Sequence, residues 1–362
     1  MGDDSVKYYK KRKKKHLPLW LVILLDLILL GAVLLTFAFF HHVLPAMVNE
    51  MDRQEVMANQ SGETDPPETT APPETEIPTQ PIQETTEPTE VTEPDTRTEW
   101  QIKFAEHFTD EVVMTENSYT SPEVSITIDT VVLGEKHSKI TYYVADIYVA
   151  SMDNFTCGTA NGELRYFGTQ PAEEMAAQTN AILAISGDFI TYQKSGFLLR
   201  NGELYASDHN RNSVCVLYPD GSMETLVGGT YDIQTVLDAN PLQVWAFGPV
   251  LLDENGQPRE EYEVSTAVGY PNPRSAIGYY EPGHYCFVVV DGRQEGHSKG
   301  MKIPELAQLF ADLGCTAAYN LDGGGTAVML FGGEAYSRQS NGGRDLGDML
   351  VITESGYGAQ EG

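Results

Sequence analysis

Apolar and polar residues divide the chain into four parts. A basic stretch at 1–16 is followed by an apolar run at 17–40 with one charged residue, Asp26, then by a polar stretch at 41–99 and a periodically patterned region at 100–362. About 20 apolar residues cross a bilayer as a helix, and a basic flank stays cytoplasmic. We therefore expect one transmembrane helix at 17–40 and an extracytoplasmic domain after it. A cleaved signal peptide would have a shorter apolar core.

Within the fourth part, short apolar patterns predict strands and a helix. Residues 124–132 alternate, and 140–150 are rich in Tyr, Val and Ile, as half-buried strands require. Residues 171–179 predict a short helix opened by proline. The apolar run 181–185 predicts a strand that leads into Ser-Gly-Asp-Phe at 186–189. These elements are the expected scaffold of a folded domain.

A strand, a helix and a second strand follow one another near the end of the chain. The apolar run 285–290 ends at Asp291, the pattern at 304–313 is helical, and the run 316–321 ends at Asp322. Strands joined by a crossover helix run parallel, so both acids should lie at one sheet edge. We predict an α+β domain built on a single mixed sheet with a βαβ crossover.

Composition narrows the classes of function. The chain carries 23 Lys and Arg against 52 Asp and Glu, a formal net charge of −29. Contact with nucleic acid needs a basic surface, so we expect no nucleic-acid partner. Residues 61–99 combine Pro, Thr and eleven acids with one base, which predicts a disordered, extended stalk. The four cysteines include no CxxC pair, and their pairing stays open.

Three glycines, Gly323 to Gly325, follow Asp322 directly. A tight turn and a backbone cradle whose N–H groups face an anion both fit such a run. The sequence lacks the GxxxxGK[ST] signature of nucleotide-binding loops, which argues against a nucleotide.

Several short motifs follow one another along the domain: SGDF at 186–189, GFLLRNG at 196–202, GP at 248–249, NPRSAIG at 272–278, VDGRQ at 290–294, GMKIPELA at 300–307, NLDGGGT at 320–326 and SNGGR at 340–344. As an ordered set they resemble the phosphodiester glycosidase family, over about residues 121–353. One position departs from the family pattern, because Ser186 stands where we expect asparagine, and this departure bears on substrate choice or rate.

The resemblance implies cleavage of a sugar-1-phosphodiester, best known for N-acetylglucosamine-1-phospho linkages. Phosphate is a good leaving group, so its departure needs little proton donation. The charge that develops on it needs stabilisation instead. Residues 101–362 hold 14 bases against 35 acids, so an anion requires a local positive group. Arg274 is our first candidate for a phosphate clamp, and Arg344 is the second, with a surface ion pair to Asp345 or Asp348 as its alternative. The phosphate site would be completed by Gly323, Gly324, Gly325 and Thr326.

Carboxylates are the expected catalytic groups, since the anomeric carbon needs one to activate water or to stabilise positive charge. Asp188, Asp291 and Asp322 each follow a predicted strand beside glycine, and we predict that all three are catalytic. A turn-capping role is the alternative for any one of them. Asn320 is expected to bind sugar or to orient Asp322, and His209 and His297 are weaker candidates for a general acid.

We predict no cofactor and no metal requirement. Three converging carboxylates can also hold a divalent cation such as Ca²⁺, but the sequence contains no EF-hand spacing and no metal-binding His pair. Dependence on a cation therefore stays open.

These features predict a single-pass protein of a bacterial envelope whose domain at 100–362 hydrolyses phosphodiester-linked sugars on cell-surface or secreted glycopolymers. The alternative is a non-catalytic envelope protein that binds phosphorylated polysaccharide in the same cleft during exopolysaccharide assembly or export. Transfer of the glycosyl group to another acceptor would use the same residues, with a hydroxyl attacking in place of water.

Overall fold

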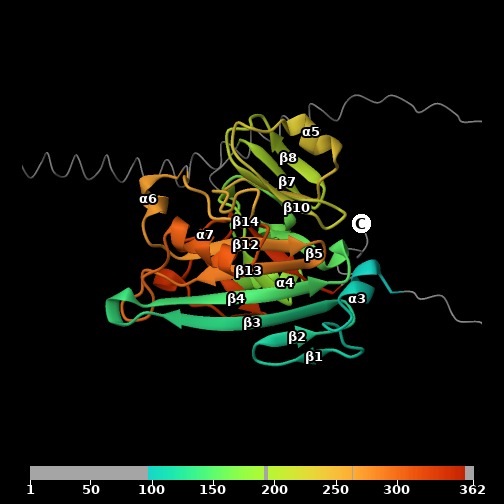
Figure 1. Ribbon diagram of the computed structural model, residues 1–362, viewed down its shortest axis with the longest axis horizontal. Coiled ribbons are helices and arrows are strands. Elements are labelled where there is room, and N and C mark those ends of the chain that lie inside the picture. Colours follow the sequence, from blue (N-terminus) through green and yellow to red (C-terminus); the bar gives the residue numbers. More distant parts are fainter. Residues whose placement is uncertain (1–96, 191–194, 263, 355–362) are drawn as a thin grey trace, which may run out of the picture. The chain divides into compact units, whose positions relative to one another are not determined.

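The computed structural model describes residues 97–190, 195–262 and 264–354. Within them the chain forms three β-sheets and a few short helices, which confirms the predicted α+β class (Figure 1). The expected membrane helix at 17–40 and most of the stalk lie outside the described residues. Among the residues that are described, no helix is long and apolar enough to cross a membrane.

The largest sheet has seven strands in the order β1-β2-β3-β4-β13-β12-β14, and each neighbouring pair is antiparallel. The two strands predicted from residues 124–132 and 140–150 are present and form one long hairpin. The strands are β1 (Val113–Met114), β2 (Ser118–Thr120), β3 (Val124–Leu133), β4 (Ile140–Val149), β12 (Arg274–Glu281), β13 (His284–Val290) and β14 (Ala317–Asn320).

The predicted crossover runs from β13 through α7 (Ile303–Asp312) to β14. β12 pairs antiparallel with both strands and lies between them, so β13 and β14 run parallel without touching. The expectation of a single mixed sheet is therefore wrong, because the described strands form three sheets. In the largest sheet β12 occupies the position beside β13 that β14 would have taken. The shared edge is confirmed, because Val290 pairs with Arg274 and Asn320 pairs with Ala276 at the same end of β12.

Two five-stranded sheets complete the described β-structure. One follows the order β16-β15-β6-β17-β5, with β5 (Phe155–Thr159), β6 (Leu183–Ser186), β15 (Met329–Phe331), β16 (Glu334–Ala335) and β17 (Asp348–Ile352). The other follows the order β10-β9-β11-β7-β8, with β7 (Phe197–Arg200), β8 (Glu203–Ser207), β9 (Val214–Leu217), β10 (Met223–Leu226) and β11 (Gln243–Trp245).

Short helices lie outside the sheets. The α-helices besides α7 are α3 (Glu99–Lys103), α4 (Ala172–Gln178), α5 (Ile233–Asp238) and α6 (Thr266–Gly269). Single 3₁₀ turns are η2 (Lys136–Ser138), η3 (Met152–Asn154), η4 (Ala160–Gly162) and η6 (Ser340–Gly342).

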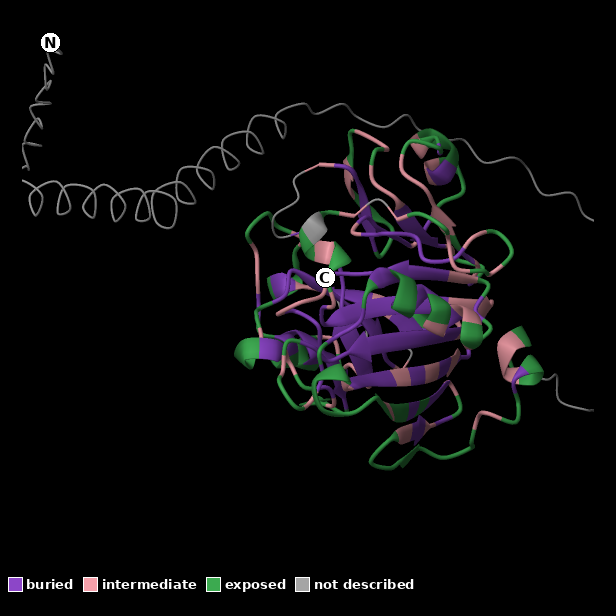
Figure 2. Cartoon of the chain, turned by 60° about the vertical axis from the view of Figure 1, so that its left-hand side comes forward, coloured by how far each residue is buried: buried purple, intermediate pink, exposed green. Residues whose placement is uncertain are grey.

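The main apolar core joins all three sheets. Phe287 of β13, Leu350 of β17 and Trp245 of β11 belong to one buried cluster, and the strands are mostly buried in Figure 2. The amphipathic helix α7 covers the outer face of the large sheet through Leu306 and Phe310. All four cysteines are buried free thiols, with 3.6 Å between the sulfurs of Cys286 and Cys315.

The candidate site lies where the ends of β6 and β14 meet. The Ser186 hydroxyl is 2.6 Å from the Ser275 hydroxyl and donates to the carbonyl of Asp322 at 3.2 Å. The N–H of Asp322 donates to the carbonyl of Gly187 at 2.8 Å. A Cβ on Gly187 would lie 2.6 Å from the Asp348 carboxyl carbon, so only glycine fits this crossing.

Candidate active site

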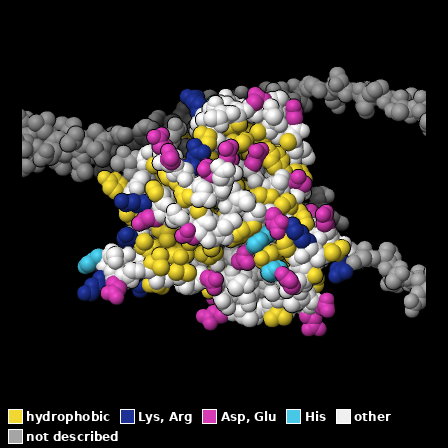
Figure 3. All heavy atoms as spheres, in the orientation of Figure 1, with side chains coloured by type: hydrophobic (Ala, Val, Ile, Leu, Met, Phe, Trp, Pro, Cys, Tyr) yellow, Lys and Arg dark blue, Asp and Glu magenta, His cyan; other side chains and the backbone are white. Residues whose placement is uncertain are grey.

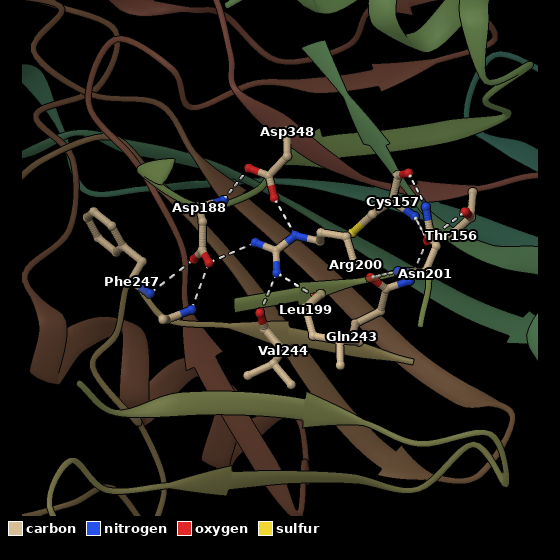
Figure 4. Close-up of polar contacts among 11 residues, drawn as sticks. Thr156, Cys157, Asp188, Leu199, Arg200, Asn201, Gln243, Val244, Phe247 and Asp348 are labelled. Carbon is tan, nitrogen blue, oxygen red and sulfur yellow. Dashed lines mark hydrogen bonds and ion pairs between the residues drawn. The ribbon is translucent and has the colours of Figure 1, made fainter. Parts of the chain in front are cut away.

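A buried ion-pair network underlies the end of β6 (Figure 4). Arg200 ends β7; its Nε donates to Asp348 at 2.8 Å, and one terminal nitrogen donates to Asp188 at 2.8 Å. Its other terminal nitrogen donates to the carbonyls of Leu199 and Val244. The side chains of Arg200, Asp188 and Asp348 are all 0% exposed. An arginine at this depth needs such partners, because burying an unpaired charge is costly.

Burial and pairing act in opposite directions on these pKa values. Burial lowers the pKa of Arg200, but the two carboxylates outweigh it, so the guanidinium stays charged. Burial raises the pKa of Asp348, while Arg200 opposes the rise. The network therefore depends on the one cation that Asp188 and Asp348 share.

Both carboxylate oxygens of Asp188 are occupied by donors of the protein. Besides Arg200, they accept the N–H groups of Ala246 at 2.7 Å and Phe247 at 3.0 Å, as Figure 4 shows. Asp188 thus holds the segment after β11 against the end of β6. It also lines the pocket described next, but its oxygens already carry three hydrogen bonds.

A small pocket opens beside Asp188, and Asp322 and Arg344 form an ion pair there. Its volume is about 10 Å³, room for about one water molecule. One terminal nitrogen of Arg344 donates to Asp322 at 2.9 Å, and the guanidinium lies 5.5 Å from the centre of the Phe189 ring. The Asp322 side chain is 10% exposed and that of Arg344 is 43% exposed. The Asp322 carboxylate and the partly exposed Arg344 guanidinium therefore both face this pocket.

The pKa of Asp322 is raised to about 6. Burial is the main cause, while Arg344 and the nearby Thr326 hydroxyl lower it and Asp188 raises it further. A carboxyl group with this pKa exchanges protons near neutral pH, as general acid–base catalysis requires.

The three glycines after Asp322 lie between two arginines. A Cβ on Gly323 would lie 2.5 Å from the carbonyl of Pro273, and Gly324 has a φ of +68°, so both positions require glycine. The terminal nitrogens of Arg293 lie 3.2 Å from a Cβ built on Gly324, and Arg344 borders Gly325. The N–H of Gly324 donates to Pro273 at 3.0 Å, so this amide is used within the protein.

Asp291 lies at the same sheet edge but is not among the residues that line the pocket. It is 2% exposed; one oxygen accepts the Tyr143 hydroxyl at 2.9 Å and lies 2.6 Å from Nε2 of His297. The other oxygen accepts the N–H of Arg338 at 3.0 Å. The structure therefore brings Asp188 and Asp322 together and pairs Asp291 with His297, a partnership that the sequence analysis missed.

Arg274 and Asn320 are both buried. Arg274 donates to the carbonyls of Met301 at 3.0 Å, Val268 at 2.6 Å and Tyr270 at 2.8 Å, and burial, with Arg293 nearby, lowers its pKa to about 10. Asn320 donates to the carbonyl of Gly248 at 2.7 Å. Its own side-chain oxygen has no hydrogen-bond partner among the residues described. Arg274 holds three backbone segments together here, whereas Arg344 faces the pocket.

Thr326 lines the pocket, and its hydroxyl donates to the carbonyl of Gly323 at 2.8 Å. Within the described ranges no group of three or more His, Cys, Asp or Glu side chains is placed to hold a metal ion.

Comparison with known proteins supports the predicted resemblance. The sequence model of the phosphodiester glycosidase family matches residues 179–353. The SPbeta prophage-derived uncharacterized protein YomE of Bacillus subtilis is 29% identical over 199 residues, which cover 52% of this chain and 31% of the relative. The N-acetylglucosamine-1-phosphodiester alpha-N-acetylglucosaminidase of Mus musculus is 27% identical over 187 residues, with coverage of 47% and 35%. The chain spans about a third of the length of these curated relatives.

Two solved structures share the fold. The catalytic domain of the zebrafish N-acetylglucosamine-1-phosphodiester alpha-N-acetylglucosaminidase, auto-inhibited by its pro-peptide, aligns with a TM-score of 0.52 and 21% identity, over 67% of this chain and 88% of that one. A hypothetical protein from Synechocystis aligns with a TM-score of 0.50 and 13% identity, over 67% and 64%. The class is thus an α+β domain with a carboxylate–arginine pocket. Residues 179–353 match the phosphodiester glycosidase family and resemble a relative named for that activity, as the motifs predicted.

Proposed function

We propose that the protein hydrolyses sugar-1-phosphodiesters, with N-acetylglucosamine-1-phosphodiesters as the first class to test. The observation that carries the proposal is the Asp322–Arg344 pair at the pocket, within the region that matches the family. A carboxylate serves the anomeric carbon, and an arginine serves the phosphate. The mouse relative, which is named for this activity, supports the choice of substrate.

In the proposed reaction Asp322 accepts a proton from water. The water oxygen attacks the anomeric carbon, the bond from that carbon to the phosphate oxygen breaks, and its electron pair leaves with the phosphate. With a pKa of about 6, Asp322 is mostly ionised at neutral pH, and the pocket beside it has room for about one water molecule. The leaving phosphate needs little protonation, so a base suffices.

Arg344 binds the phosphate in this proposal. A guanidinium carries five N–H donors, and one is used for Asp322. The side chain is 43% exposed and lies beside Gly325, so its other donors can reach a phosphate at the mouth of the pocket. Arg344 also keeps Asp322 ionised, which links phosphate binding to the state of the base.

The remaining predicted groups support this pair. Asp188 positions the backbone around the pocket through Arg200 and the two amides after β11. Sugar binding by Asn320, whose buried side-chain oxygen has no hydrogen-bond partner among the residues described, stays a prediction. A catalytic role for Asp188 and Asp291 and a phosphate role for Arg274 stay predictions.

Location also belongs to the proposal. The basic flank and the apolar run at 17–40 support a single-pass anchor with the domain outside the cytoplasm, where cell-surface or secreted glycopolymers would be the substrates. Membrane fractionation of cells expressing the full chain or a chain lacking residues 1–40 tests this. The full chain should sediment with membranes and the shortened chain should not; equal sedimentation of both would contradict the anchor.

The activity is tested by incubating the full chain with UDP-N-acetylglucosamine and with methyl N-acetylglucosamine-1-phosphodiester, with and without chelator, and following free sugar by NMR. Asp322→Asn should lower the rate by at least about 100-fold, the size of a lost general base. Asp312→Asn, at an exposed position at the end of α7, is the matched control and should retain the rate. An intact diester that nevertheless binds would favour the non-catalytic alternative.

A further inference from the structure

A second, larger pocket lies next to the glycine loop. Its volume is about 410 Å³, within the range of small-molecule sites. It is lined by Lys136, Lys139, Arg293, Lys299 and His137, and by one carboxylate, Glu295. This acid lies 3.8 Å from Nδ1 of His137. Basic side chains gather at the left-hand edge of Figure 3, around the tip of the β3–β4 hairpin.

The concentration of positive charge contrasts with the rest of the domain. Residues 101–362 contain 14 Lys and Arg against 35 acids, and four of these 14 line this one pocket. None of the four is held in an ion pair within the described part of the chain. A polyanion is repelled by the acidic surface elsewhere and attracted here.

The walls of the pocket are tied together. The N–H of Lys299 donates to the carbonyl of Lys139 at 2.9 Å, and the Ser298 hydroxyl accepts the N–H of Thr141 at 3.0 Å. These bonds fix the hairpin tip to the segment after β13. Arg293 is held by Asn272, whose side-chain oxygen accepts two of its N–H groups at 3.1 and 2.8 Å. The cations are therefore presented on a fixed frame.

Arg293 connects this pocket to the candidate active site. It lines the pocket, and its terminal nitrogens lie 3.2 Å from a Cβ built on Gly324, two residues after Asp322. From standard backbone dimensions, the guanidinium is within about 12 Å of the Asp322 backbone. A chain-like ligand can thus extend from one pocket to the other.

We propose that the basic pocket binds a further phosphate of a glycan whose sugars are linked by repeated phosphodiesters, while another linkage of the same chain occupies the Asp322–Arg344 pocket. This inference rests on the proposed function and specifies its substrate as a polyanionic phosphoglycan. Arg293, which lines the pocket and lies beside the glycine loop, places the cations next to the candidate active site; this suits a glycan chain that occupies both, whereas an anionic lipid surface would not need the connection.

The test uses the full chain and two synthetic probes, a tetramer of N-acetylglucosamine units joined by 1,6-phosphodiesters and methyl N-acetylglucosamine-1-phosphodiester. The test variant is Lys136→Gln with Lys299→Gln, both exposed positions of the pocket. The matched control is Lys103→Gln with Arg165→Gln, which removes the same charge from exposed ion pairs elsewhere. Binding of labelled tetramer is followed by fluorescence anisotropy at several salt concentrations, and hydrolysis of both probes by NMR.

The test variant should bind the tetramer about tenfold more weakly, with a shallower salt dependence, because two charge contacts are lost. Its hydrolysis of the methyl diester and the binding by the control variant should be unchanged. Equal tetramer affinity in all three proteins would overturn the inference. A sedimentation assay with phosphatidylglycerol vesicles tests a lipid ligand, and the inference also fails if the test variant loses binding to these vesicles but not to the tetramer. If neither probe is hydrolysed, the proposed function fails, while anisotropy still decides whether the pocket binds the phosphoglycan.

Discussion

Replacing Arg200 by methionine removes the guanidinium that pairs with both Asp188 and Asp348. All three side chains are 0% exposed, so water cannot take over its role without opening the core. Methionine has a similar length and leaves no large cavity. Breaking a buried ion pair by removing one partner costs about 3–5 kcal/mol, because the remaining carboxylates stay buried without a cation. In a domain of this size such a loss lowers Tm by roughly 10 °C.

The loss should depend on pH with a definite sign. Burial raises the folded-state pKa of Asp348 to about 7 in the natural chain, and without Arg200 this pKa should rise further. A group with a raised folded pKa stabilises the fold fully at low pH, and this contribution is lost as pH rises through the folded pKa. The free energy of unfolding lost by the variant, relative to the natural chain, should therefore be larger at pH 8 than at pH 5, with the increase beginning near pH 7.

Urea unfolding of the full chain, followed by tryptophan fluorescence at both pH values, measures these quantities. Arg165→Met is the matched control, since Arg165 pairs with Glu163 at the surface and both are more than half exposed. That change should cost at most about 1 kcal/mol. A loss below about 1 kcal/mol for Arg200→Met at pH 8, or a loss that shrinks as pH rises, would refute the account of the network.

Two further predictions concern the pocket. If ionised Asp322 is the base, kcat/KM should rise with pH through about 6. Arg344→Gln removes a group that lowers the pKa of Asp322, so the rising part of the pH–rate profile should move to higher pH; an unchanged profile would contradict the Asp322–Arg344 pairing. Gly187→Ala places a methyl group 2.6 Å from the Asp348 carboxyl and should cost about 1–3 kcal/mol in urea unfolding. Gly269→Ala, where nothing lies within 4 Å of the added Cβ, should be nearly neutral, and equal effects of the two changes would contradict the crowding at Gly187.

The sequence predicts the parts of the fold that local patterns determine. The β13–α7–β14 crossover follows from strand and helix periodicities, and the acids at its strand ends do lie at one sheet edge. The insertion of β12 between these strands does not follow, because strand pairing depends on contacts between distant residues. The division into three sheets cannot be predicted from the sequence for the same reason.

In the candidate site, contacts between side chains far apart in the sequence could not be predicted either. Arg344 and Asp322 lie 22 residues apart in the sequence, and their pairing was not predicted; the alternative considered for Arg344 was an ion pair with Asp345 or Asp348. Arg200 and Asp348 were missed because a charged residue within a strand gives no sign that it is buried. Arg274 belongs to a family motif, but three backbone carbonyls surround its guanidinium, a feature that only the folded chain reveals.

The most direct test of the central claim is the NMR assay on N-acetylglucosamine-1-phosphodiester with the full chain and its Asp322→Asn variant. The account predicts free N-acetylglucosamine from the natural chain and at least about a 100-fold slower release from the variant, with the fold of the variant unchanged by circular dichroism. Release at equal rates by both proteins would contradict the assignment of Asp322. An intact diester with both proteins would contradict the hydrolase itself.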